Sequence, residues 1–232
     1  ASAAGFRVVS RTLAEARVRR GVLHHQGRVL TSERLREMIQ HACLDAGAMA
    51  MHTIASAGDQ VVDNHCVGRG PIRAGELIVV DIFPQRIDDG YWGDMTRTYL
   101  KGRASDAQRR LVRTVRKAHR LAMDMIKPGV RGGRVHEEVE DLFAREGYET
   151  DRNPPEQKGF FHALGHAVGL EIHEEPIMRH GASFRFRKGM VMTVEPGLYY
   201  RGLGGARIED VVHLVSGGNE KISSAPYRWE IA

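Results

Sequence analysis

A short apolar segment of this sequence ends in an acid. Residues 77–80 read Leu-Ile-Val-Val, and Asp81 follows directly. Such a run is typical of a strand buried in a sheet. The carboxylate at its end would be carried toward the interior, where an ionised group is costly unless it is paired or binds a metal. The segment therefore predicts a buried sheet that delivers a charged group in need of a partner.

The sequence after Asp81 predicts a hairpin that returns with a second acid. Asp88, Asp89 and Gly90 supply turn residues, and residues 91–99 are expected to form the paired strand with Asp94 within it. The two turn acids are potential decoy ligands, but they sit in a polar turn. We therefore expect the acid at the strand end and Asp94 to face each other.

Three further candidate ligands come from strand-like segments of the second half. They are His166, Glu195 and Glu209, beside or within predicted strands at 167–172, 190–194 and 206–215. Four carboxylates and one imidazole gathered in a core could not all stay ionised, because desolvated like charges repel. Divalent cations remove that difficulty. Oxygen-rich ligation with a single His suits Mn²⁺, with Co²⁺, Zn²⁺ or Fe²⁺ feasible on ligand type.

Helices alternate with these strands, and the pattern indicates one α+β domain over residues 1–232. The expected elements are a helix carrying Phe6, Val9, Leu13 and Ala16, a second helix that begins at Thr31 and Ser32, a strand at 49–54, a basic helix that stops at Pro128 and Gly129, and a helix carrying Val135, Val139, Leu142 and Phe143 that ends near Gly147.

The net charge of +5, with much of the basic excess between Arg103 and Arg120, raises the question of a nucleic-acid partner. The same segment carries an apolar stripe at Leu111, Val115, Ala118, Ala122 and Met125. That stripe predicts a helix whose Arg and Lys residues lie on its solvated outer face. We therefore expect no nucleic-acid partner.

Composition also narrows the cellular setting. No apolar run approaches the roughly 18 residues that cross a bilayer, so no membrane partner is expected. Residues 1–20 are rich in Ala and Arg, as in a transit peptide, but helical spacing favours a first helix packed on a core. Cys43 and Cys66 are too few for a disulfide framework and have no CxxC spacing. A reducing, cytoplasmic location is the expectation.

Five stretches place the candidate ligands in a specific context. They are Val80-Asp81, Gly93-Asp94-Met95-Thr96-Arg97-Thr98, residues 162–173 (HALGHAVGLEIH), residues 194–199 (VEPGLY) and residues 206–210 (ARIED). Together they closely resemble the metallopeptidase family that includes Xaa-Pro aminopeptidase, Xaa-Pro dipeptidase (prolidase) and methionine aminopeptidase. The resemblance runs over nearly the whole chain. It implies the pita-bread (creatinase/aminopeptidase) fold, a curved antiparallel sheet with helices on its outer face.

The same resemblance implies a role for each candidate ligand. Asp81 would chelate one of two divalent cations, His166 and Glu195 would hold the other, and Asp94 and Glu209 would bridge both. A bridging water or hydroxide is implied as the nucleophile. Glu195 would in addition relay a proton toward the leaving amine.

Four other residues match positions that surround the metals in the family. His162 and His173 would hydrogen-bond the substrate or the tetrahedral intermediate. His65 matches another substrate-side histidine, although a loop histidine can also be simply solvated. Arg207 would sit beside Glu209 and keep that acid oriented and ionised.

The EPGLY and RIED strings look like those of the proline-directed members. The implied activity is hydrolysis of the peptide bond between an N-terminal residue and proline, as an aminopeptidase or a dipeptidase acting on peptides. Alternatives are another metal-dependent hydrolase or lyase on the same scaffold, a methionine aminopeptidase, or a non-catalytic binding module. Nothing here corresponds to the N-terminal domain that proline-directed members usually carry, which leaves substrate length and a homodimer open.

Overall fold

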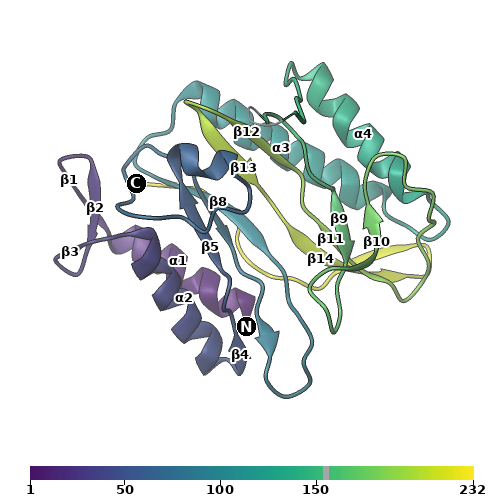
Figure 1. The fold of residues 1–232 in the computed structure, drawn as a ribbon, viewed down its shortest axis with the longest axis horizontal. Coiled ribbons are helices and arrows are strands. Elements are labelled where there is room, and N and C mark those ends of the chain that lie inside the picture. The colour runs from purple at the N-terminus through teal and green to yellow at the C-terminus, as the bar shows by residue number, and fades with distance from the viewer. Residues whose placement is uncertain (154–156) are drawn as a thin grey trace.

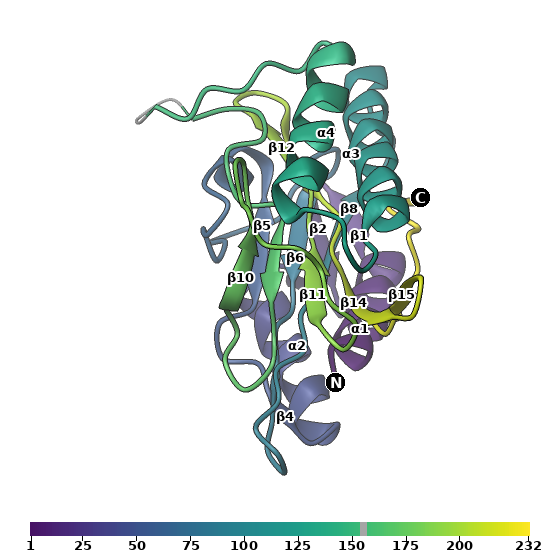
Figure 2. The same cartoon turned by 90° about the vertical axis from the view of Figure 1, so that its right-hand side faces the viewer.

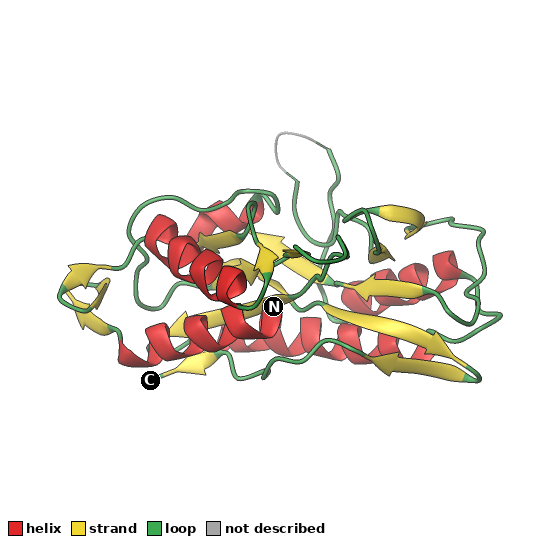
Figure 3. Cartoon of the chain, turned by 90° about the horizontal axis from the view of Figure 1, so that it is seen from below, coloured by secondary structure: helices red, strands yellow, loops and turns green. Residues whose placement is uncertain are grey.

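The computed structural model describes residues 1–153 and 157–232, and helices and strands are distributed along the whole length of the molecule (Figure 3). The helices are α1 (Ser2–Glu15), α2 (Ser32–Asp45), α3 (Asp106–Met125) and α4 (Gly132–Arg145), with a 3-10 turn at Gly58–Val62. The strands are β1 (Arg17–Arg19), β2 (Val22–His25), β3 (Arg28–Val29), β4 (Ala48–Met49), β5 (Ile54–Ala57), β6 (Ile78–Asp81), β7 (Gln85–Arg86), β8 (Thr96–Lys101), β9 (Gly165–Ala167), β10 (Glu174–Met178), β11 (Val191–Val194), β12 (Gly197–Tyr200), β13 (Gly204–Arg207), β14 (Asp210–Val215), β15 (Gly218–Lys221) and β16 (Glu230–Ile231).

The first half of the chain builds a four-stranded sheet in the order β16-β8-β6-β5. Strands β5, β6 and β8 are antiparallel, and the register places Asp81 opposite Thr96. The short strand β16 comes from the far end of the described chain and pairs in parallel with β8, Glu230 opposite Leu100. Residues 230 and 231 therefore complete a sheet whose other strands lie between positions 54 and 101.

The second half builds a five-stranded antiparallel sheet in the order β10-β9-β11-β14-β15. Strands β12 and β13 form a separate two-stranded ribbon, and β1–β3 and β4–β7 form two small outlying sheets. Strand β13 lies against both β6 and β8. The two halves of the molecule thus meet where β13 passes the first sheet.

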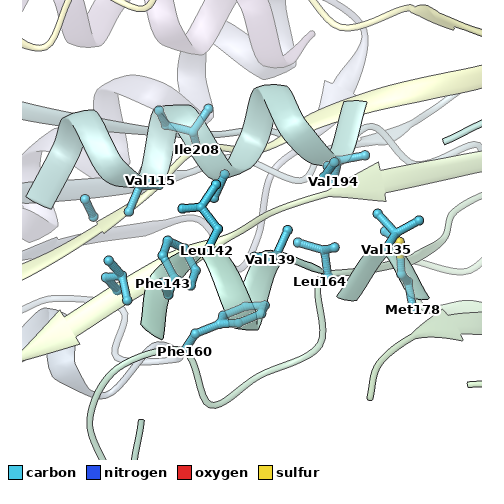
Figure 4. Packing of buried hydrophobic residues seen from close by; sticks show 14 of the residues in the cluster. Val115, Val135, Val139, Leu142, Phe143, Phe160, Leu164, Met178, Val194 and Ile208 are labelled. Atoms are coloured by element: carbon cyan, nitrogen blue, oxygen red, sulfur yellow. The ribbon is translucent and has the colours of Figure 1, made fainter. Parts of the chain in front are cut away.

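Two hydrophobic cores correspond to these halves. Helices α1 and α2 pack against each other (Figure 1), and Phe6 and Ile39 are buried there with Val80 of β6. Helices α3 and α4 lie side by side (Figure 2) and cover the second sheet. Figure 4 shows side chains of that second core, where Val115 and Phe143 pack with residues of the strands. The apolar stripes predicted for the first helix, for α3 and for α4 are buried, except that Met125 is half-buried.

Local sequence explains where two of the helices begin. The Thr31 hydroxyl caps α2 by accepting from the Arg34 backbone N–H at 3.3 Å. Ser105 and Gln108 form a reciprocal capping box at the start of α3. On α3, Arg110, Arg113 and Arg116 are exposed, as predicted for a solvated outer face. Within the described ranges, no helix has the length and apolarity required to cross a membrane.

Four predicted strands differ from the observed ones. The strand expected at 49–54 is divided between β4 and β5 by a turn, in which the Thr53 hydroxyl donates to the Ala50 carbonyl at 3.2 Å. The hairpin turn at 88–90 is correct, but β8 begins only at Thr96, so Asp94 lies before the strand and not within it.

The other two differences are in the second half. Strand β9 ends at Ala167 because the following residues turn, with the Gly169 N–H donating to the Glu171 carbonyl at 3.1 Å. The strand expected at 206–215 is broken at Ile208 and Glu209 into β13 and β14. The Glu209 backbone N–H donates to the Thr96 carbonyl of β8 at 3.0 Å. Glu209 therefore does not continue the strand pairing of β13 or β14.

Candidate metal centre

The structure brings all five predicted ligand residues around one cavity of about 120 Å³. His166 is the central residue of a three-residue strand, and the other four stand at a strand end or within two residues of one. The five positions are Asp81 as the last residue of β6, Asp94 before β8, His166 in the middle of β9, Glu195 directly after β11, and Glu209 between β13 and β14. Residues from both halves of the chain therefore share one buried site.

Three of these residues already lie close enough to share one cation. Ligand atoms of Asp94, His166 and Glu209 lie within 4.8 Å of one another, in a search of residues 1–153 and 157–232. The His166 Nε2 atom is 3.6 Å from Asp94 Oδ2 and 3.5 Å from Glu195 Oε1. The Nδ1 atom of that ring lies 3.0 Å from the Ala167 carbonyl, to which it must donate. This tautomer leaves the Nε2 lone pair facing the carboxylates, as metal ligation requires.

Burial shifts the pKa values of Asp94, His166, Glu195 and Glu209 in the direction that favours the uncharged form. It raises the pKa of Asp94 and of Glu209, and the neighbouring carboxylates raise both further. Burial raises the pKa of Glu195 to about 8 even though the Arg207 charge acts in the opposite direction. It lowers the pKa of His166 to about 4. Acids that resist ionisation around a neutral imidazole fit a site for divalent cations, whose charge would favour the ionised carboxylates.

Arg207 is buried beside this cluster and organises its Asp81 side. Its Nη2 atom donates to Asp81 Oδ2 at 2.8 Å, and its Nε atom donates to the Thr96 hydroxyl at 3.2 Å. That hydroxyl in turn donates to Glu209 Oε2 at 2.8 Å. Arg207 thus forms its ion pair with Asp81 and reaches Glu209 through Thr96. Among described residues, Asp81 Oδ1 is buried without a hydrogen-bond partner, which leaves a ligand atom free.

The three predicted substrate-side histidines occupy different positions. His65 and His173 line the cavity, and the His173 ring lies edge-on to His166 with centroids 4.4 Å apart. His162 lies outside the cavity lining. Its Nδ1 donates to the Ala163 carbonyl at 2.7 Å, and its Nε2 accepts from the Tyr199 hydroxyl at 3.0 Å.

Tyr199 links His162 to the arginine. The Arg207 Nη1 atom donates to the Tyr199 oxygen at 2.8 Å, so the tyrosine proton is directed at His162. Burial, followed by the Arg207 charge, lowers the pKa of His162 to about 3 and keeps the ring neutral. A hydrogen-bonded chain therefore runs from Asp81 through Arg207 and Tyr199 to His162.

Sequence reasoning did not identify Thr96 and Tyr199 as members of the site. Tyr199 is the last residue of the VEPGLY string, and no local sequence pattern connects it to His162. Thr96, Arg97 and Thr98 alternate along β8, and the Thr98 hydroxyl donates to the Arg207 carbonyl at 2.9 Å. Thr96 and Thr98 lie on the same face of a buried strand, and buried hydroxyl groups need hydrogen-bond partners. That pattern could have indicated that these two residues support the site.

A buried ion pair fixes the backbone next to Glu209. Arg97 Nη2 donates to Asp210 Oδ1 at 2.8 Å, and the two side chains are 2% and 0% exposed. Arg97 Nη1 also donates to the Glu209 carbonyl at 2.6 Å. Burial alone would raise the pKa of Asp210, but His119, whose Nε2 atom lies 3.3 Å from Asp210 Oδ2, and the Arg97 charge outweigh it and hold the pKa below the ordinary value.

Gly165 positions His166 by allowing a close approach between strands. A Cβ atom at residue 165 would lie 2.1 Å from the Thr193 carbonyl oxygen of β11. Gly165→Ala is therefore expected to lower the free energy of unfolding by about 1–3 kcal/mol and to weaken metal binding through displacement of His166. Thermal unfolding and metal titration would measure both. Gly218→Ala is a matched control, because nothing lies within 4 Å of its added Cβ; equal effects of the two variants would contradict the steric reason.

The α+β scaffold and the buried carboxylates around one imidazole define a candidate metalloprotein. The chain belongs to metallopeptidase family M24, whose family model matches residues 2–216. Membership in this family implies use of a divalent metal. It confirms the resemblance inferred from the motifs.

Individual relatives agree with this assignment. The Xaa-Pro dipeptidase of Pyrococcus horikoshii is 31% identical over 175 residues, which cover 75% of this chain and 47% of that relative. The structure of dipeptidase PepE from Mycobacterium ulcerans matches with a TM-score of 0.83 at 29% identity, over 100% of this chain and 58% of that one. The Xaa-Pro dipeptidase from Bacillus anthracis gives 0.84 at 27% identity, over 98% and 59%. These matches confirm the pita-bread fold, and the chain spans about half the length of the curated relatives it matches.

Proposed function

We propose that this chain carries the catalytic centre of an Xaa-Pro peptidase, which hydrolyses the bond between an N-terminal residue and proline. The observation that carries the proposal is the convergence of four carboxylates and one neutral imidazole on a single cavity. The relatives are an Xaa-Pro dipeptidase and a dipeptidase, and they suggest the substrate class. A cavity of about 120 Å³ has the volume of about four water molecules, which suits one residue at a peptide end.

The proposed centre holds two divalent cations, with Mn²⁺ as the expected metal and Co²⁺, Zn²⁺ or Fe²⁺ as alternatives. Asp81 would bind one cation, His166 and Glu195 the other, and Asp94 and Glu209 would bridge them. The cations would polarise the scissile carbonyl and activate a water molecule.

The remaining chemistry belongs to side chains that surround the cations. Glu195, kept ionised by the cations, would take up a proton from the water and deliver it to the leaving amine. His173 and His65 line the cavity and would contact the peptide. Arg207 holds Asp81 in position through the bond at 2.8 Å. His162 would act through Tyr199, to which its ring is bonded.

The test is hydrolysis of X-Pro, X-Pro-Y and Met-Ala-Y peptides by metal-stripped protein with and without Mn²⁺. Manganese-dependent cleavage restricted to the proline peptides is expected, and the length preference separates dipeptidase from aminopeptidase. Binding of two cations per chain, measured by calorimetry, is the parallel readout. Preferred cleavage of Met-Ala-Y, or metal binding with no cleavage of any peptide, would contradict the proposal and indicate a methionine aminopeptidase or another substrate class.

Tyr199→Phe tests whether the tyrosine hydroxyl supports the centre. The substitution removes the proton donor to His162 and an acceptor for Arg207, so kcat is expected to fall by about 10–100-fold. KM should change little if His162 only positions other groups, and should rise if its ring contacts the peptide. A parental kcat would exclude a role for this hydroxyl. Tyr91→Phe, at a residue that is 54% exposed, is the control.

A further inference from the structure

A second cavity, of about 290 Å³, lies on the outer side of β8 between α3 and residues 227–230. It shares no lining residue with the metal cavity, in the part of the chain that the structure describes. Arg97 of β8 and Ile208 form part of its wall. The residue next to Ile208 is the proposed ligand Glu209, so the two cavities lie on opposite sides of one backbone segment.

The rim of this second cavity carries more positive than negative charge. Its side chains include Arg97, Arg109, Arg113, Arg116 and a single acid, Glu230. Arg109 is neutralised by that acid, with Nη2 and Oε1 2.7 Å apart. Arg97 is neutralised by an acid outside the lining. Within residues 1–153 and 157–232, no ion pair to Arg113 or Arg116 is found. These two guanidinium groups, three positions apart on α3, therefore remain available to an anion.

The walls below this rim are apolar and held in place. Tyr227, Trp229 and Val112 contribute aromatic and aliphatic surface. The Tyr227 hydroxyl donates to Asp210 Oδ2 at 2.5 Å, and the buried Arg97 guanidinium lies 4.4 Å from the ring centroid. The Trp229 carbonyl accepts from the Leu100 N–H at 2.7 Å. The aromatic surface is thus anchored to β8 and β14.

We propose that this cavity binds a small phosphate or carboxylate that carries a flat apolar body. The body would lie against Trp229 and Val112. The anionic group would bind Arg113 and Arg116, and the Arg116 guanidinium is held 5.3 Å from the centroid of the Tyr227 ring. The cavity has the volume of about ten water molecules, enough for a monocyclic aromatic anion. A solvated helix face still describes Arg110 and Arg120, which are exposed on α3 and do not line the cavity.

Phenyl phosphate is the probe, and Trp229 is the reporter. The chain has 2 tryptophans, so a Trp92→Phe background leaves only Trp229 fluorescent. Saturable quenching by phenyl phosphate is expected. Arg113→Gln with Arg116→Gln should weaken its binding at least about tenfold, since two charge-assisted contacts are lost. Arg110→Gln with Arg120→Gln removes the same charge from exposed positions of α3 outside the cavity lining and should change the affinity less than about twofold.

Several results would overturn the proposal. One is the absence of saturation in the parent protein, and another is an equal loss in the two double variants, which would indicate only the general field of the helix. Inorganic phosphate binding as tightly as phenyl phosphate would exclude recognition of the apolar body, and benzyl alcohol binding as tightly would exclude recognition of the anion. Circular dichroism and thermal unfolding confirm that the variants are folded. The readout is independent of peptidase activity, so failure of the proposed function leaves this test intact.

Discussion

Glu209→Gln is expected to abolish metal-dependent hydrolysis without unfolding the protein. The substitution removes one proposed bridging carboxylate and should lower turnover by at least about 100-fold, the upper range for loss of a residue that only supports a metal ligand. An amide oxygen can still accept from the Thr96 hydroxyl, which lies 2.8 Å from Glu209 Oε2. Burial and then the charge of Asp94 raise the pKa of Glu209 in the parent protein. The uncharged glutamine removes this unfavourable interaction between two buried acids. The metal-free variant should therefore be at least as stable as the parent.

Turnover and thermal unfolding with and without Mn²⁺ measure these effects together. The variant should lose most of the stabilisation that added metal gives the parent. Glu220→Gln, at an exposed position of β15, removes the same charge and should leave both properties unchanged. Parental activity of Glu209→Gln would sink the assignment of the site. If the metal-free variant is less stable than the parent, repulsion among the acids does not dominate the effect of this substitution on the free energy of unfolding.

In metal-free protein, stability is expected to fall as pH rises from about 6.5 to about 8, and excess Mn²⁺ is expected to reverse the slope. The pKa of Glu195 is raised by burial from 4.5 to about 8. The folded state thus binds a proton in this window that the unfolded state has released, and stability decreases with pH. Cations require ionised carboxylates, so their stabilisation increases with pH.

The lower limit of this window is set by the histidines. Burial lowers the pKa of His166 from 6.5 to about 4 and that of His162 to about 3. Unfolding takes up protons at these rings below pH 6.5, which makes stability rise with pH there and opposes the carboxylate effect. For each 1 kcal/mol by which the free energy of unfolding decreases above pH 6.5, the melting temperature should fall by about 2–4 °C. Calorimetry at a series of pH values measures the slope, and Glu195→Gln should flatten it. A rising metal-free slope between these pH values would refute the protonation argument.

Much of the site could be predicted because each ligand stands beside a local signal. Asp81 ends an apolar strand that remains buried on all its residues, and Glu195 directly follows β11. The exact course of the chain around the ligands could not be predicted in the same way. The break at Glu209 depends on a hydrogen bond from its N–H to Thr96, a residue 113 positions away. No sequence pattern within either segment predicts that hydrogen bond.

The supporting hydrogen bonds show the same limit. The resemblance to the metallopeptidase family placed Arg207 beside Glu209. In the folded molecule the Arg207 side chain spans to Asp81 of β6, at 2.8 Å, because β13 lies against β6 and β8. Residues two apart on a regular strand point to the same face, but the strand is broken at Ile208 and Glu209 between β13 and β14, so this pair does not keep that geometry.

The parallel pairing of β16 with β8 has a consequence for synthesis on the ribosome. Ile231 belongs to the core of α1 and α2, whose other members all lie before residue 102. During translation these earlier segments leave the exit tunnel first, at roughly 5–20 residues per second. Their sheet still presents β8 as an open edge until residue 231 emerges. An unpaired edge can recruit other strands, so the edge at Leu100 and Lys101 stays open to mispairing until β16 emerges.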